Sequence, residues 1–140
     1  ASVAVADSTS VNLFKVLTAA VALSGRAGSG DVIVSERENF PTDLYIAESV
    51  VAAHGLRLEL IDGADVLARL TDAAAPSIAI LMLTHVNYRS GYQHDMAAVG
   101  ALAHARGALV VWDLAHSAGA VPLDLTADGA DLARDRCAPS

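Results

Sequence analysis

The chain has 140 residues, enough for one domain of ordinary size. Hydrophobic residues make up 54% of it and aromatic residues only 4%, which favours a layered α/β core of small side chains over an all-β sandwich. The net charge of -7 repels phosphate backbones and argues against a nucleic-acid partner. No apolar run reaches the ~18 residues of a membrane span. Cys137 is the only cysteine, which excludes an internal disulfide and favours a cytoplasmic protein.

Short β-branched runs alternate with stretches of helical periodicity along the chain. In chain order we expect a strand at Val3–Ala6, a helix at Val11–Leu23, a strand at Asp31–Ser35, a helix at Leu44–Ala53, a strand at Leu56–Ile61, a helix at Ala64–Thr71, a strand at Ile78–Leu83, a helix at Asp95–Ala105 and a strand at Ala108–Trp112. Strands that are apolar on both faces, each followed by a helix, predict a mostly parallel sheet with helices on both faces. Residues 1–131 would form this sheet as part of a large domain, and residues 132–140 a divergent or disordered tail.

Polar residues gather where four of the expected strands end. They are Asp7–Ser10, Glu36–Asp43, Thr84–Tyr88 and Asp113–Ser117. Ligands of such sheets bind beyond the carboxyl ends of the strands, so the four clusters predict one shared site.

The first cluster places Thr9 and Ser10 at the start of a helix. Free backbone N–H groups, the helix dipole and the two hydroxyls would together bind an anion such as phosphate. The alternative is that these residues only cap the helix, as Ser and Thr commonly do.

The next two clusters offer an aromatic ring and a hydroxyl. Phe40, beside a proline in a loop, could stack on a flat ring or could plug the gap between loop and sheet. Asp43 could contact a ligand or cap the following helix. Thr84 could donate to a ligand or could bond to the backbone at its strand end.

The fourth cluster contains Asp113, at the end of an apolar strand, and His116 three residues later. A buried carboxylate needs a cation or several donors, and a protonated pyridine nitrogen is one such cation. A metal pair, an acid/base couple, or plain packing of His116 are the alternatives. A metal is disfavoured because no paired ligand spacing occurs among the remaining histidines, His54, His85, His94 and His104.

Four stretches of the chain together resemble the kynureninase family of fold-type-I pyridoxal-phosphate enzymes. They are Asp7–Phe14, Glu36–Asp43, Leu83–Gly91 and Val111–Gly119, spread over nearly the whole chain. The resemblance implies part of the large domain of such an enzyme, with pyridoxal 5′-phosphate as cofactor. Its phosphate would lie at the helix start, its ring against an aromatic side chain, and its nitrogen at a carboxylate. The implied cofactor-binding residues are Thr9, Ser10, Phe40, Pro41, Thr42, Asp43, Thr84, Asp113 and His116.

The resemblance also implies an activity for the parent protein. The family hydrolyses L-kynurenine or 3-hydroxykynurenine to anthranilate or 3-hydroxyanthranilate and L-alanine, in tryptophan catabolism and NAD biosynthesis. Its members act as homodimers.

The chain departs from the family at the catalytic lysine. After Ala130-Asp131 the family continues toward a Tyr-Lys that forms the Schiff base, and no such pair occurs here. Lys15 is the only lysine and falls within a predicted helix. We therefore expect a fragment without a catalytic residue, inactive by itself.

Three other interpretations remain open at this point. One is a relative among the cysteine desulfurases or class V aminotransferases, and another is a pseudoenzyme remnant. A third is a non-catalytic α/β binding module, although Gly25–Gly30 precedes a strand and so does not form a nucleotide-binding fingerprint.

Overall fold

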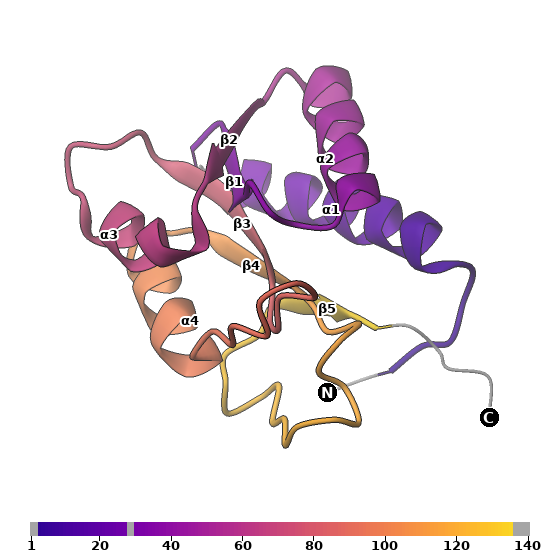
Figure 1. Ribbon diagram of the computed structural model, residues 1–140. Helices are drawn as coiled ribbons and strands as arrows, with labels where there is room; N and C mark the ends of the chain where they lie inside the picture. Colours follow the sequence, from indigo (N-terminus) through magenta and orange to yellow (C-terminus); the bar gives the residue numbers. More distant parts are fainter. Residues whose placement is uncertain (1–2, 28–29, 136–140) are drawn as a thin grey trace.

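The computed structural model describes residues 3–27 and 30–135 as one layered α/β unit (Figure 1). Its elements are α1 (Thr9–Ala27), β1 (Val32–Glu36), α2 (Pro41–His54), β2 (Arg57–Ile61), the 3-10 turn η1 (Gly63–Asp65), α3 (Val66–Thr71), β3 (Ile78–Thr84), α4 (Met96–Ala105), β4 (Leu109–Asp113) and β5 (Leu132–Arg134). The strands form one sheet in the order β2-β1-β3-β4-β5, and every neighbouring pair is parallel. The predicted parallel sheet is confirmed.

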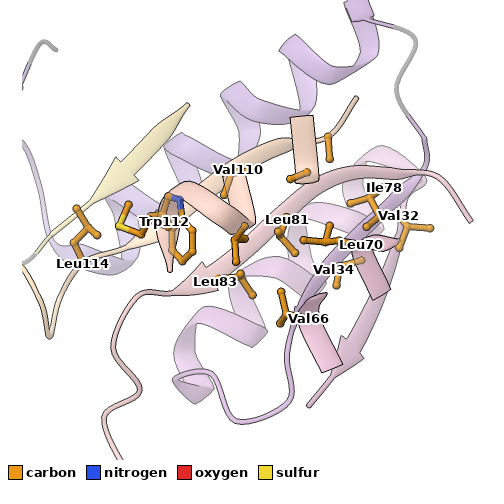
Figure 2. Packing of buried hydrophobic residues seen from close by; sticks show 14 residues of the cluster. Val32, Val34, Val66, Leu70, Ile78, Leu81, Leu83, Val110, Trp112 and Leu114 are labelled. Carbon is orange, nitrogen blue, oxygen red and sulfur yellow. The ribbon is translucent and has the colours of Figure 1, made fainter. Parts of the chain in front are cut away.

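Helices cover both faces of this sheet, as the sequence predicts. On one face α1 and α2 bury Leu13, Leu17 and Val50 against strand residues such as Ile80 and Val111. On the other face α3 and α4 pack against alternate strand residues. Figure 2 shows this second core, which contains Val66, Leu70, Leu81, Leu83 and Trp112. The alternation along β3 and β4 therefore decides which side chains face which helix pair.

Helix α2 begins earlier than the sequence predicts. The sequence predicts a helix from Leu44 with Asp43 as a possible cap, but the helix starts at Pro41, with Phe40 as its N-cap residue. Proline is common at the first position of a helix, because its fixed φ is already helical and the N–H that it lacks has no partner within the helix there. Asp43 consequently lies inside the first turn. The helix ends at His54, and Gly55 follows as its C-cap residue with a left-handed φ of 67°, a conformation that glycine adopts readily.

The predicted strand at Val3–Ala6 is wrong. These residues form no strand, and their side chains are exposed. A strand needs a hydrogen-bonding neighbour, and no described strand pairs with this segment. The β-branched residues there indicated a strand that tertiary pairing does not support.

Strand β5 was not predicted. Leu132–Arg134 lie in the segment assigned to a tail, yet they pair in parallel with Val111–Asp113 of β4. Three residues are too short for a periodicity signal, and pairing with β4 forms the strand. Of the rest of that segment, residues 136–140 with Cys137 lie outside the described residues.

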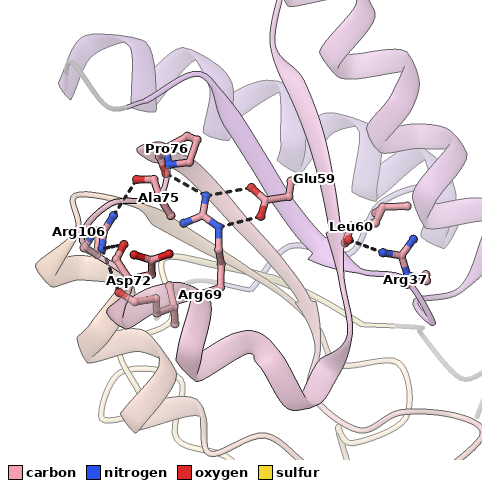
Figure 3. Close-up of polar contacts among 9 residues, drawn as sticks. Arg37, Glu59, Leu60, Arg69, Asp72, Ala75, Pro76 and Arg106 are labelled. Atoms are coloured by element: carbon pink, nitrogen blue, oxygen red, sulfur yellow. Dashed lines mark hydrogen bonds and ion pairs between the residues drawn. The ribbon is translucent and has the colours of Figure 1, made fainter.

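Arginine side chains fix the connections on the α3 side of the sheet (Figure 3). Arg69 donates two hydrogen bonds to Glu59, at 2.8 and 2.9 Å, and one to the carbonyl of Pro76. The paired guanidinium lowers the pKa of the Glu59 carboxyl. Arg106 donates to the carbonyl of Asp72 at 2.7 Å. These contacts hold the loop that leads into β3.

A substitution at Gly30 tests how closely the backbone packs just before β1. An added Cβ there would lie 2.0 Å from the backbone oxygen of Ser77. We expect Gly30→Ala to lower the free energy of unfolding by about 1–3 kcal/mol, because backbone must move to relieve the overlap. Urea denaturation followed by circular dichroism measures the change.

Gly25 provides the matched control. A Cβ at Gly25 meets nothing within 4 Å, and the residue lies in α1. Gly25→Ala should raise the free energy of unfolding by about 0.5–1 kcal/mol, because alanine loses less backbone entropy in a helix. Equal unfolding midpoints for the two variants would contradict the described packing.

Candidate functional site

A cavity opens at the carboxyl edge of the sheet, beside the first turns of α1 and α2. Its lining comes from both helix starts, from the loop after β4 and from β5. The lining residues are Thr9, Ser10, Phe40, Thr42, Asp43, Asp113, Ala115, His116 and Arg134. Of the residues predicted from the sequence, all but Pro41 and Thr84 line this cavity.

Strand register brings three polar side chains into one row. Thr84 of β3 is opposite Asp113 of β4, and Asp113 is opposite Arg134 of β5. Residues in register on neighbouring strands point to the same face, here the face that Met82 and Val111 share with α1 and α2. The row therefore meets the helix starts at the floor of the cavity.

The centre of the site is a buried cluster of one cation and two carboxylates. The Nη2 of Arg134 donates to Oδ2 of Asp43 and lies 3.0 Å from Oδ2 of Asp113. The three side chains are 4–5% exposed. The other carboxylate oxygen of Asp113 accepts a hydrogen bond of 2.9 Å from the backbone N–H of Ala115. Charges removed from water to this extent are tolerated only when they are paired, as they are here.

Burial dominates the ionisation of Asp43. It raises the pKa of this carboxyl to about 6. The Arg134 guanidinium opposes the shift, and the neighbouring Asp113 carboxylate adds to it. Asp43 is thus ionised and paired at neutral pH but takes up a proton in mildly acidic solution.

The start of α1 keeps two hydroxyl groups available. The capping contact comes from Ser8, whose Oγ accepts from the N–H of Val11 at 3.4 Å. Within the described residues, the side chains of Thr9 and Ser10 make no hydrogen bond of their own. Thr9 and Ser10 both line the cavity, whereas the N–H groups of Val11 and Asn12 are already paired with Ser8. The alternative that Thr9 and Ser10 serve only as caps is therefore disfavoured.

Phe40 and His116 line the cavity, and both contact Tyr88, which lies outside its lining. Phe40 and Tyr88 meet edge to face with ring centroids 5.5 Å apart, and Tyr88 lies 6.1 Å from the His116 ring. Phe40 remains 45% exposed, so it does not plug the gap between loop and sheet. The described residues leave its ring and that of His116 available to a ligand in the cavity.

Thr84 and Pro41 act behind the cavity in this structure. The Thr84 hydroxyl donates to Oδ1 of Asn39 at 2.7 Å, and the same oxygen accepts from the N–H of Phe40, also at 2.7 Å. Pro41 starts α2. Both residues thus position Phe40, while direct contact of Thr84 with a ligand stays a prediction.

Sequence reasoning missed Arg134 and Tyr88. Arg134 lies in a segment read as a tail, and no local pattern marks β5. Tyr88 belongs to the polar cluster after β3, so its position at a strand end was a usable signal.

No group of three or more His, Cys, Asp or Glu side chains able to hold a metal occurs within residues 3–27 and 30–135. Among those residues, too, no helix has the length and hydropathy required to cross a bilayer.

Residues 10–134 match the family description of the class-V aminotransferases, and the chain belongs to this family. It is 53% identical over 134 residues to the kynureninase of Pseudomonas fluorescens, a match that covers 94% of this chain and 32% of that protein. The chain therefore spans about a third of the length of such relatives.

Solved structures share the fold. The apo cysteine desulfurase of Thermococcus onnurineus superposes with a TM-score of 0.72 at 25% identity, over 91% of this chain and 32% of that one. A C-DES mutant with glycine covalently linked to its PLP cofactor gives a TM-score of 0.74 at 20% identity, over 92% and 35%. The described sheet is part of the fold-type-I architecture of pyridoxal-phosphate enzymes.

The raised pKa of Asp43 predicts a pH-dependent stability. The folded chain holds the Asp43 proton up to about pH 6, whereas the unfolded chain releases it near 3.8. Stability from this group is therefore lost as the pH rises from about 4 to about 6. Asp43→Asn does not titrate, so its free energy of unfolding should rise relative to the natural chain across this window, by up to about 3 kcal/mol. Urea denaturation at half-unit pH steps measures the difference.

Asp31→Asn is the control with the opposite sign. The pKa of Asp31 is lowered, chiefly by its hydrogen bond with Arg57, so this group stabilises the fold more as the pH rises. The free energy of unfolding of Asp31→Asn should fall relative to the natural chain with rising pH. A pH-independent difference for Asp43→Asn would refute the account of this carboxyl.

Proposed function

We propose that this chain is the cofactor-binding part of a kynureninase, which uses pyridoxal 5′-phosphate to hydrolyse L-kynurenine or 3-hydroxykynurenine. The products would be anthranilate or 3-hydroxyanthranilate, and L-alanine. One observation carries the proposal: a single cavity is lined by hydroxyl side chains, by aromatic rings and by the buried Asp113, which is paired with a cation. The 53% identity to a kynureninase supports this activity over others in the family.

The start of α1 would hold the phosphate. Thr9 and Ser10 offer two hydroxyls and unpaired backbone N–H groups at the positive end of a 19-residue helix. Their side chains need not break a hydrogen bond within the described residues to do so. Phosphate is among the anions that such a donor set binds.

The ring would lie between the aromatic side chains and the carboxylates. Phe40 and His116 line the cavity, and Asp113 already pairs with a cation, the Arg134 guanidinium. A protonated ring nitrogen carries the same charge, so the donor set fits the cofactor. When bound, pyridoxal phosphate supplies an electron sink to the reacting substrate, and a carboxylate at its nitrogen is needed for that role. Asp113 would keep this nitrogen protonated.

Among the described residues, no amine lines the cavity. Lys15 is 57% exposed, pairs with Asp7, and does not line the cavity. We infer that the 140 residues alone do not catalyse the hydrolysis, because Lys15, the one lysine of the sequence, lies outside the cavity and cannot bond to the cofactor's aldehyde there.

The biological setting follows from the same proposal. A kynureninase would act in tryptophan catabolism and NAD biosynthesis, as a cytoplasmic homodimer. The acidic charge and small-residue core of the chain agree with a soluble enzyme acting on a small molecule.

A cysteine desulfurase-like activity is the second candidate. The Thermococcus onnurineus cysteine desulfurase shares the fold at a TM-score of 0.72 and 25% identity. The higher identity to kynureninase over nearly the same part of the chain favours the hydrolase.

A chimera tests the activity. Residues 7–131 would replace the matching segment of the Pseudomonas fluorescens kynureninase, which supplies the lysine and the remaining domain. We expect the chimera to release anthranilate from L-kynurenine, measured by its fluorescence, and the 140-residue chain alone to release none. Asp113→Asn in the chimera should lower the rate by about 10²–10³-fold, because a charge placed at the reacting system is lost.

Asp62→Asn is the control, since Asp62 pairs with Arg37 in the open, away from the cavity. It should leave the rate unchanged. A folded chimera that binds the cofactor but releases sulfur from cysteine, and no anthranilate from L-kynurenine, would favour the second candidate.

A further inference from the structure

We propose that Arg134 is an internal competitor of the cofactor, whose guanidinium occupies the carboxylate site that a protonated ring nitrogen would take. The inference rests on the proposed cofactor site. Arg134 is not among the site residues predicted from the sequence. Ring binding would then require Arg134 to leave Asp113.

The position of Arg134 follows from strand pairing. β5 sets Arg134 opposite Asp113, and the backbone N–H of Leu114 donates to the Arg134 carbonyl at 2.8 Å. The side chain is therefore directed over the end of β4 into the cavity, where it lies among the lining residues. A ring nitrogen at Asp113 and the guanidinium would have to share the Oδ2 atom.

The acceptor atoms of Asp113 support competition over joint binding. Its Oδ1 accepts the hydrogen bond from the backbone N–H of Ala115, and its Oδ2 lies 3.0 Å from the Arg134 guanidinium. A protonated ring nitrogen placed at Oδ2 would face the like charge of the guanidinium at close range, which is unfavourable. The ring nitrogen and the guanidinium therefore compete for this one oxygen.

Arg134 is held at only part of its hydrogen-bonding capacity. Its Nη2 serves both carboxylates, while its Nε is buried and has no partner among the described residues. An unpaired buried donor costs free energy that displacement into water would recover. β5 is also three residues long and lies at the edge of the described sheet, which makes displacement less costly than it would be from a central strand.

The test uses two phosphate probes on the 140-residue chain. Pyridoxine 5′-phosphate has the ring nitrogen but no aldehyde, so it cannot bond to Lys15. Benzyl phosphate has a ring and a phosphate but no nitrogen. Isothermal titration calorimetry would compare the natural chain with Arg134→Met, Arg134→Lys and, as a control far from the cavity, Arg57→Met.

We expect Arg134→Met to bind pyridoxine 5′-phosphate at least about tenfold more tightly than the natural chain, because removing the competing cation frees Asp113. Benzyl phosphate should bind no more tightly to the variant. Arg134→Lys, which keeps the charge, and Arg57→Met should both resemble the natural chain. Circular dichroism checks that each variant is folded.

Equal affinity of the natural chain and Arg134→Met for pyridoxine 5′-phosphate would overturn the competition while leaving the cofactor site in place. Failure of both probes to bind any variant would overturn the cofactor site itself.

If Arg134→Met does not fold, nuclear magnetic resonance of the Arg134 Nε–H in the natural chain tests whether the ring displaces the guanidinium. Pyridoxine 5′-phosphate, but not benzyl phosphate, should shift this signal and speed its exchange with water. An unchanged signal at saturation would contradict displacement.

Discussion

The site depends on a single buried cation shared by two buried carboxylates. Asp43 comes from the first turn of α2, Asp113 from the end of β4 and Arg134 from β5, so the cluster ties a helix to two strands. Neither carboxylate could remain charged at this depth without a positive partner. The fold therefore provides a place at the sheet edge where one cation must sit, and the choice of cation decides between a closed ion cluster and an occupied cofactor site.

The parallel sheet makes this arrangement possible. Because all five strands run in the same direction, their carboxyl ends meet at one edge, and the helices that follow or precede them start there. α1 and α2 cover the same face, so the free donors of Thr9 and the ring of Phe40 reach the row that Asp113 belongs to. On the opposite face Trp112 and its neighbours pack against α3 and α4, and none of these core residues lines the cavity.

The sequence predicted most of this arrangement, for identifiable reasons. Alternation of apolar strands and helices predicts the sheet, and the strand-end rule places Asp113 and the Phe40 loop at one edge. The strand expected at Val3–Ala6 fails because strand propensity says nothing about a pairing partner. Arg134 was missed because β5 exists only through pairing with β4, which no local pattern encodes. The contact between Thr84 and Asn39 was equally hidden, since it joins residues 45 positions apart.

The central claim is that the cavity seats a phosphorylated pyridine ring, with its phosphate at the start of α1 and its nitrogen at Asp113. A crystal structure of the 140-residue chain with saturating pyridoxine 5′-phosphate tests it most directly. We predict the phosphate on Thr9 and Ser10, the ring beside Phe40 and His116, and the nitrogen on Asp113, with Arg134 turned away. A phosphate bound by Arg134, with the ring nitrogen facing solvent, would contradict the account.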